Sequence, residues 1–105
     1  MNTLKTKKAI NFDLSVSALK QHYPSNNYNK SWYDIKNYLQ QNNFCHRQYS
    51  GYVSSSTIEM TDVIEIIISM SLYFKWLQYC VKQFDITIVS DQYSMLEYIH
   101  HQILF

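Results

Sequence analysis

Apolar and polar residues alternate in short stretches of the chain. Residues 9–14 and 84–89 place every second side chain on an apolar side, which is the period of a half-buried strand. Residues 44–55 contain one candidate tight turn, at Ser50-Gly51, where glycine supplies the positive φ that a primed turn requires. We therefore expect two single strands and one β-hairpin.

Helical periodicity fills the intervals between these strands. Ser15 predicts the start of a short helix that ends near His22. Sequences typical of capping boxes start at Ser31, Ser56 and Ser94, and each precedes a run with apolar residues at helical spacing. The helix after Ser56 is the richest in isoleucine, so we expect it to be the most buried of the helices.

The predicted order is strand, one or two helices, strand, strand, helix, strand, helix. Without the last helix this is βαββαβ, a ferredoxin-like α+β fold whose antiparallel sheet carries helices on one face. We expect a single domain over 1–105, with a flexible arm at 1–7, the ferredoxin-like core at 8–93 and an extra C-terminal helix at 94–105. The other face of the sheet must then be solvated or covered by a partner.

Composition removes several classes of protein. The 105 residues include one glycine and one proline, which excludes the glycine-rich phosphate loop and the dinucleotide fingerprint. The formal net charge is +1, so any nucleic acid must be bound by a local site rather than by a global positive field. Cys45 and Cys80 form no CxxC motif, which argues against a zinc site or a disulfide framework.

Membrane and export signals are weak in this sequence. The apolar run at 66–74 is about half the length of a membrane span. The basic residues before Lys8 precede too few apolar residues to form the core of a signal peptide. We therefore expect a soluble cytoplasmic protein that makes no membrane contact.

The register of the hairpin decides which side chains share the uncovered face. A two-residue turn at Ser50-Gly51 would place Tyr49 opposite Tyr52, on the same side as Arg47. A slip of one residue would exchange the two sides, so both registers stay open. In the first register the uncovered face carries Asn11, Asp13, Arg47, Tyr49, Tyr52, Ser54, Asp85 and Thr87. Arginine pairs with phosphate and tyrosine stacks on unpaired bases, so this face suits RNA.

Asp13 ends the first strand on this face. It is either a surface residue that helps to cap the following helix or part of a chemical site. One carboxylate makes a poor metal site, whereas two can hold Mg²⁺. A symmetric dimer through the uncovered face would bring Asp13 beside its own copy.

Several motifs occur together in a characteristic order. They are Ala9-Ile10-Asn11-Phe12-Asp13-Leu14, Tyr28-Asn29-Lys30-Ser31-Trp32-Tyr33-Asp34-Ile35, Asn43-Phe44, Gln48-Tyr49-Ser50-Gly51-Tyr52-Val53, Tyr73-Phe74-Lys75 and the strand from Phe84 to Val89. In this layout the chain resembles the virulence-associated protein D family. The resemblance implies a small dimeric bacterial protein with a ferredoxin-like fold, related to small CRISPR-associated nucleases. It also implies an endoribonuclease that in some members prefers purines, or the toxin of a toxin–antitoxin pair.

The resemblance places the strand aspartate of the family on Asp13, its hairpin serine on Ser50 and the tyrosine after the turn on Tyr52. One departure is that the family's glycine before the serine is Tyr49 here, and glycine follows at Gly51.

The leading hypothesis is a homodimeric endoribonuclease that cleaves single-stranded RNA. Asp13 and its copy would bind Mg²⁺ or activate the attacking group, and Ser50 would hydrogen-bond the phosphate. The remaining RNA contacts would come from Arg47, Tyr49, Tyr52 and Lys30. His22 is a further candidate as a general acid, although it also fits an ordinary surface position.

Two alternatives remain open. The first is a non-catalytic dimeric module that binds a partner protein, such as a small antitoxin, through the uncovered sheet face or an edge strand. The ten tyrosines favour it, because tyrosine is enriched at interfaces. The second alternative is a protein that binds RNA without cleaving it.

Overall fold

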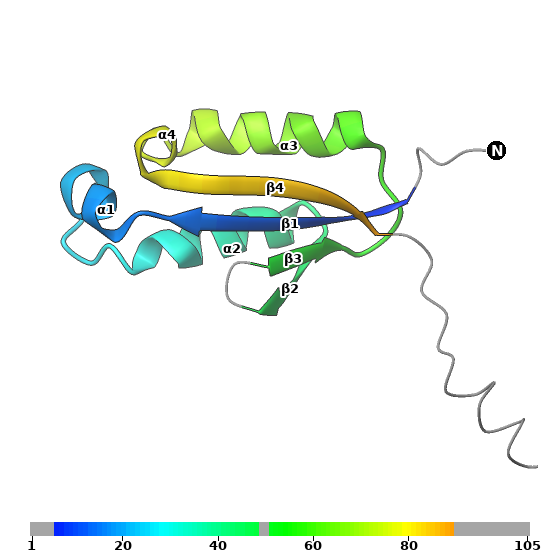
Figure 1. Cartoon of the computed structure of the whole chain (residues 1–105), viewed down its shortest axis with the longest axis horizontal. Helices are drawn as coiled ribbons and strands as arrows, with labels where there is room; N and C mark the ends of the chain where they lie inside the picture. Colours follow the sequence, from blue (N-terminus) through cyan, green and yellow to red (C-terminus); the bar gives the residue numbers. More distant parts are fainter. Residues whose placement is uncertain (1–5, 49–50, 90–105) are drawn as a thin grey trace, which may run out of the picture.

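A four-stranded antiparallel sheet with helices on one face forms the protein in the computed structural model (Figure 1). The structure describes residues 6–48 and 51–89, with the side chain of Gln48 left out. The elements are β1 (Lys7–Leu14), α1 (Val16–His22), α2 (Lys30–Gln41), β2 (Phe44–Gln48), β3 (Gly51–Ser54), α3 (Met60–Tyr73), α4 (Leu77–Cys80) and β4 (Val81–Val89). This order confirms the predicted ferredoxin-like α+β fold. The predicted helix at 94–105 lies outside the described residues.

The strands lie in the order β2-β3-β1-β4, and all neighbouring pairs are antiparallel. The first strand, β1, lies inside the sheet and pairs with β3 on one side and with β4 on the other. Ile10, for example, lies opposite Tyr52 of β3 and Ile86 of β4. The first and last strands of the described chain are therefore direct neighbours, which brings distant segments of the sequence together.

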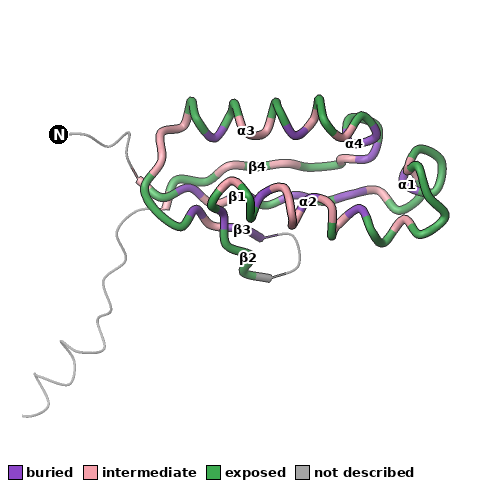
Figure 2. The backbone as a smooth tube through the Cα atoms, turned by 180° about the vertical axis from the view of Figure 1, so that it is seen from behind, coloured by how far each residue is buried: buried purple, intermediate pink, exposed green. Residues whose placement is uncertain are grey.

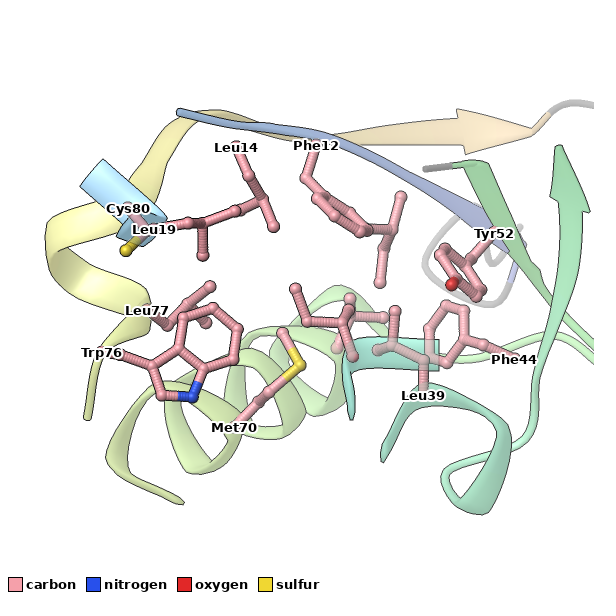
Figure 3. Packing of buried hydrophobic residues seen from close by; sticks show 13 residues of the cluster. Phe12, Leu14, Leu19, Leu39, Phe44, Tyr52, Met70, Trp76, Leu77 and Cys80 are labelled. Atoms are coloured by element: carbon pink, nitrogen blue, oxygen red, sulfur yellow. The ribbon is translucent and has the colours of Figure 1, made fainter. Parts of the chain in front are cut away.

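The core fills the space between the sheet and the helices α2 and α3 (Figure 3). Burial alternates along β1, with Ile10, Phe12 and Leu14 pointing into the core, as the period of two predicted. Ile35 and Leu39 of α2 are fully buried, so the predicted apolar face of that helix is confirmed. Figure 2 shows the buried residues following β1 and one side of each of these helices. The opposite face of β1 is exposed.

The helix starts agree with the prediction in one case out of three. Ser15 is the N-cap of α1, and its Oγ accepts a hydrogen bond from the backbone of Ala18. Ser31 does not cap α2, because this side chain is buried and donates to the carbonyl oxygen of Tyr28. The predicted box at Ser56 is also wrong, because α3 begins four residues later and Glu59 makes no capping bond with its side chain.

The helix α3 is less buried than its sequence predicts. Only Val63 and Met70 are buried, whereas Ile64 and Ile68 are exposed. The prediction that α3 is the most buried helix is therefore wrong. One helix has only one side that can face a sheet, so an all-apolar run must leave part of its surface uncovered.

The hairpin register differs from the predicted one. Tyr52 lies opposite His46, three residues from the predicted partner Tyr49, and a shift occurs before Gln48 pairs with Gly51. Gly51 is therefore part of β3 rather than of the turn. An odd shift exchanges the two sides of a strand. Tyr52 and Ser54 accordingly face the core, and the prediction that they lie on the uncovered face is wrong.

Aromatic burial explains this register. The ring of Tyr52 stacks on Phe12 with centroids 6.0 Å apart and on His46 with centroids 4.8 Å apart. Only 2% of Tyr52 remains exposed. Its ring lies within the core (Figure 3). A buried aromatic ring contributes far more to stability than an exposed one. Burial also raises the pKa of Tyr52 to about 12.

The start of β1 is held by a buried lysine. Nζ of Lys8 donates to the carbonyl and hydroxyl oxygens of Thr6 and to the carbonyl oxygen of Ile58. Thr6 also forms a β-bridge with Ile58. Thr6 and Lys7 thus belong to the sheet rather than to the arm predicted at 1–7.

Candidate functional site

The uncovered face of the sheet collects polar residues from β1 and β4. The register places Asn11 opposite Asp85 and Asp13 opposite Gln83. Residues that lie opposite one another in an antiparallel pair point to the same face. All four are exposed, and Thr87 joins the same face opposite Ala9. The predicted grouping of Asn11, Asp13, Asp85 and Thr87 is therefore confirmed.

Asp13 projects from the end of β1 into solvent. Its side chain is 62% exposed, and Oδ2 lies 3.7 Å from Nζ of Lys82, which is 61% exposed. Ser15, and not Asp13, supplies the side chain that caps α1. Asp13 therefore does not cap α1. Its one ion-pair partner within the described chain is the exposed side chain of Lys82.

Lys82 is a candidate that the sequence did not single out. It stands at the beginning of β4, and the pairing of β4 with β1 brings it beside Asp13. Nothing in the local sequence of residues 81–83 marks it, because the signal lies in a long-range register. An ammonium group beside a carboxylate can offset the repulsion between that carboxylate and an incoming phosphate.

A second carboxylate lies on the same face. Asp13 lies directly opposite Gln83, and Asp85 is two residues farther along β4 than Gln83. Asp85 is therefore a diagonal neighbour of Asp13. Diagonal neighbours of this kind are typically about 7–8 Å apart. The amide of Gln83 donates to Oδ2 of Asp85 over 2.6 Å, which orients that carboxylate.

The carboxylates of the uncovered face supply only part of the ligand set that Mg²⁺ needs. Mg²⁺ is usually held by one or two carboxylates together with substrate phosphates and water. Asp13 supplies one accessible carboxylate for such an ion. Within the described residues no group of three or more His, Cys, Asp or Glu side chains could enclose a metal. A full set of ligands would therefore need RNA phosphate or a second copy of Asp13.

The other predicted site residues that the structure describes do not gather around Asp13. Arg47 is exposed on β2, which β3 separates from β1. Lys30 is exposed at the first residue of α2, in the helical layer behind the sheet. Tyr49 and Ser50 lie outside the described residues. Tyr52 is buried, so its ring cannot stack on a base at the uncovered face.

The fold and this face define a class of protein. The chain is a ferredoxin-like α+β protein whose uncovered sheet face presents an exposed strand-end aspartate beside a lysine. Within the described residues, no helix has the length and apolar character needed to span a bilayer.

One curated protein is similar over most of the chain. The sequence is 24% identical over 88 residues to the endoribonuclease VapD 2 of Riemerella anatipestifer, an alignment that covers 84% of this chain and 94% of that protein. No family model matches the chain. The similarity supports a distant relationship to VapD-like proteins and suggests a ribonuclease, in agreement with the resemblance drawn from the motifs between Ala9 and Val89.

Proposed function

We propose that this protein is an endoribonuclease that cleaves single-stranded RNA on the uncovered face of its sheet. The observation that carries the proposal is Asp13. It is an exposed carboxylate at the end of β1, free of helix capping and paired with Lys82. It lies in a chain distantly similar to an endoribonuclease.

Cleavage of an RNA phosphodiester needs a group that accepts a proton from the attacking oxygen and positive charge near the phosphate. The carboxylate of Asp13 can accept the proton, and this proton passes back through water to the leaving oxygen as its bond to phosphorus breaks. The ammonium of Lys82, within 4 Å of that carboxylate, can pair with a phosphate oxygen on which negative charge develops. Both groups are accessible, so a strand of RNA can reach them without any movement of the core.

Magnesium fits this proposal as a further component. Asp13 would be the protein ligand, and a copy of Asp13 from a second subunit would complete a pair of carboxylates. A bound Mg²⁺ would supply additional charge neutralisation at the phosphate.

Ser50 is proposed to contact the phosphate. Its neighbour Gly51 pairs with Asn11 of β1, two residues before Asp13. Arg47, exposed on β2 beyond β3, is proposed to bind RNA farther from Asp13.

A homodimer formed through the uncovered face would bring two copies of Asp13 together. We also propose that the protein acts in the cytoplasm as the toxin of a toxin–antitoxin or virulence-associated system, with a small antitoxin protein as partner. These parts of the proposal rest on the resemblance to the virulence-associated protein D family.

The test compares the wild-type protein with Asp13→Asn on end-labelled single-stranded RNA, with Mg²⁺ or with EDTA. A matched control is Asp62→Asn, because Asp62 is an exposed aspartate in the first turn of α3, an element of the helical layer. We expect Asp13→Asn to lower the cleavage rate by at least about 100-fold, which is typical for loss of a catalytic acid–base group. Asp62→Asn should cleave at the wild-type rate. Equal rates for all three proteins would refute the role of Asp13, and loss of cleavage in EDTA would establish a role for the metal.

A second candidate function is a module that binds a protein partner. The helix α3 presents an exposed apolar stripe of Ile64, Ile68 and Leu72, and β4 is an edge strand of the described sheet. Exposed apolar stripes and free edges are typical docking surfaces. Intact RNA in every reaction, together with a stoichiometric partner that Ile68→Asp fails to bind, would favour this function.

A further inference from the structure

A hollow of about 500 Å³ opens near the end of the sheet where β1 stops and β4 begins. It lies between the end of α1, the start of α2 and the segment that joins α3 to α4. Its lining combines aromatic rings with charged or polar groups, namely Tyr73, Phe74 and Trp76 with His22, Asp34 and Lys75. The proposed chemistry at Asp13 uses none of these residues.

The aromatic wall of this hollow is held in place by its neighbours. The ring of Phe74 meets Tyr73 edge-on with centroids 4.9 Å apart, and its centroid lies 5.5 Å from that of Trp76. Tyr23 in turn meets Trp76 edge-on at 5.0 Å. Tyr73 itself remains 72% exposed. A fixed ring with an open face is a stacking platform, and every nucleobase has a π-face that can use one.

Asp34 supplies an acceptor beside this wall. Its Oδ2 accepts a hydrogen bond of 2.5 Å from the hydroxyl of Tyr23. Its second oxygen accepts no hydrogen bond from the described residues, so it is available to a ligand. Burial and the neighbouring carboxylate both raise the pKa of Tyr23, and this keeps the hydroxyl protonated as a donor. The carboxylate is therefore oriented and suited to the N–H groups of a base.

The hollow is linked to Asp13 through contacts around the end of the sheet. His22 stacks on Tyr79 of α4 with centroids 4.8 Å apart, and Tyr79 is 59% exposed. The backbone N–H of Ser15 donates to the carbonyl of Cys80, which ties α4 to the end of β1. Lys82 follows two residues later and pairs with Asp13. Tyr79 is thus a second exposed ring, in contact with the His22 side of the hollow and on the helix that leads into Lys82.

We propose that this hollow is a base-binding subsite for single-stranded RNA, which deepens the proposed ribonuclease function and rests on it. One unstacked base packs against Tyr73, and its N–H groups donate to Asp34. Lys75 neutralises the adjoining phosphate. The strand then passes the Tyr79–His22 stack toward Asp13. A base in a duplex is already stacked and paired, so the subsite selects single-stranded RNA.

The test is fluorescence anisotropy of a labelled eight-nucleotide single-stranded RNA. All proteins carry Asp13→Asn, so that the RNA stays intact, and circular dichroism verifies their fold. The test variants are Tyr73→Ala and Tyr79→Ala. The matched control is Tyr33→Ala, because Tyr33 is 56% exposed on α2 and does not line the hollow. A third variant, Asp34→Asn, is tested on eight-nucleotide oligomers of A, C and U.

We expect Tyr73→Ala and Tyr79→Ala each to weaken binding by about 5- to 150-fold, the range for loss of one base–aromatic stack. Tyr33→Ala should bind like its parent. Asp34→Asn should change the order of affinity among the three oligomers, because its amide replaces an acceptor with a donor. A duplex of the same length should bind more weakly than the single strand.

Equal affinity for Tyr73→Ala, Tyr79→Ala and Tyr33→Ala would overturn the subsite, and so would absence of RNA binding by the parent. The proposed function fails separately. If the tyrosine variants weaken binding while Asp13→Asn cleaves RNA at the wild-type rate, the subsite stands and the catalytic role of Asp13 is lost.

Discussion

Nζ of Lys82 lies 3.7 Å from Oδ2 of Asp13, although one residue belongs to the last described strand and the other to the first. The pair exists because β4 lies beside β1 in the sheet. Both side chains are more than half exposed, so the attraction between them is screened by water and contributes little to stability. Their juxtaposition therefore matters mainly for the ligand that the face can bind.

Lys82→Met removes the charge and keeps most of the side chain. We expect weaker RNA binding and a slope of log affinity against log salt that is smaller by about 0.7, the value for one lost phosphate contact with a single strand. The free energy of unfolding should change by less than about 0.5 kcal/mol, as at other exposed positions. Anisotropy titrations between low and moderate salt, together with urea unfolding, measure both quantities.

The control for this experiment is Lys36→Met, because Lys36 lies on α2 and does not line the hollow. It should leave the salt slope unchanged. A salt slope for Lys82→Met that equals the wild-type value would mean that Lys82 does not contact phosphate.

Short-range patterns predicted most of the fold. Each strand and helix of the described chain, apart from the single turn of α4, was predicted from a signal within its own segment, namely periodicity, a capping residue or a turn. The Ser15 cap is equally local, because a hydroxyl at the N-cap needs only its own helix. The order of these elements then restricted the topology to the ferredoxin-like arrangement.

Long-range packing decided what the sequence did not predict. The side of β3 that carries Tyr52 depends on stacking with Phe12 and on a register shift near Gln48, which no local motif encodes. Ser31 is buried rather than serving as a cap, because α2 already begins at Lys30 and Asn29 is its N-cap. The Lys82–Asp13 pair likewise requires knowledge of which strands are neighbours. The grouping of Asn11, Asp13 and Asp85 was predictable, because alternation alone fixes their face.

The hydrogen bonds of Lys8 should stabilise the start of β1. Its buried ammonium group donates to oxygens of Thr6 and Ile58, and its exposed fraction is 1%. Lys8→Met takes the donor away from the carbonyl oxygen of Ile58, whereas the carbonyl oxygen of Thr6 still accepts the backbone N–H of Ile58. Each unsatisfied buried group costs about 1–3 kcal/mol, and we expect a loss of that size in the free energy of unfolding measured with urea.

Lys7→Met is the matched control, since the neighbouring Lys7 is exposed on the same strand. It should change the free energy of unfolding by less than about 0.5 kcal/mol. Equal stability of the two variants would show that the bonds of Lys8 contribute nothing net.

The raised pKa of Tyr52 predicts that the protein loses stability at alkaline pH. Burial raises its pKa to about 12, above the value of 10 for a free phenol. A raised pKa means that the folded state favours the protonated form. The stabilisation is therefore complete below pH 10 and is lost as the pH rises through 12.

Tyr52→Phe removes this titration and keeps the buried ring. Between pH 8 and pH 11 the wild-type protein should lose about 1 kcal/mol more of its free energy of unfolding than Tyr52→Phe does. Urea unfolding at the two pH values measures the difference, because every other residue is the same in the two proteins. An identical loss in the two proteins would contradict a raised pKa at Tyr52.

The two cysteines should differ sharply in reactivity. This difference tests how tightly α4 packs against the end of β1. Cys45 is exposed on β2, whereas Cys80 is fully buried at the end of α4, and burial raises the pKa of its thiol. Only a solvent-accessible thiolate reacts with an aromatic disulfide reagent. At pH 8 we expect Cys45 to react rapidly and Cys80 at least about 100-fold more slowly, because exposing Cys80 requires an opening that costs several kcal/mol.

The control variant Cys45→Ser should abolish the fast phase and leave the slow one, and urea at the unfolding midpoint should accelerate the slow phase. If Cys80 reacts as fast as Cys45 in the native protein, the contact between α4 and the end of β1 opens too easily to hold Tyr79 and Lys82 in the positions on which the proposed RNA path depends.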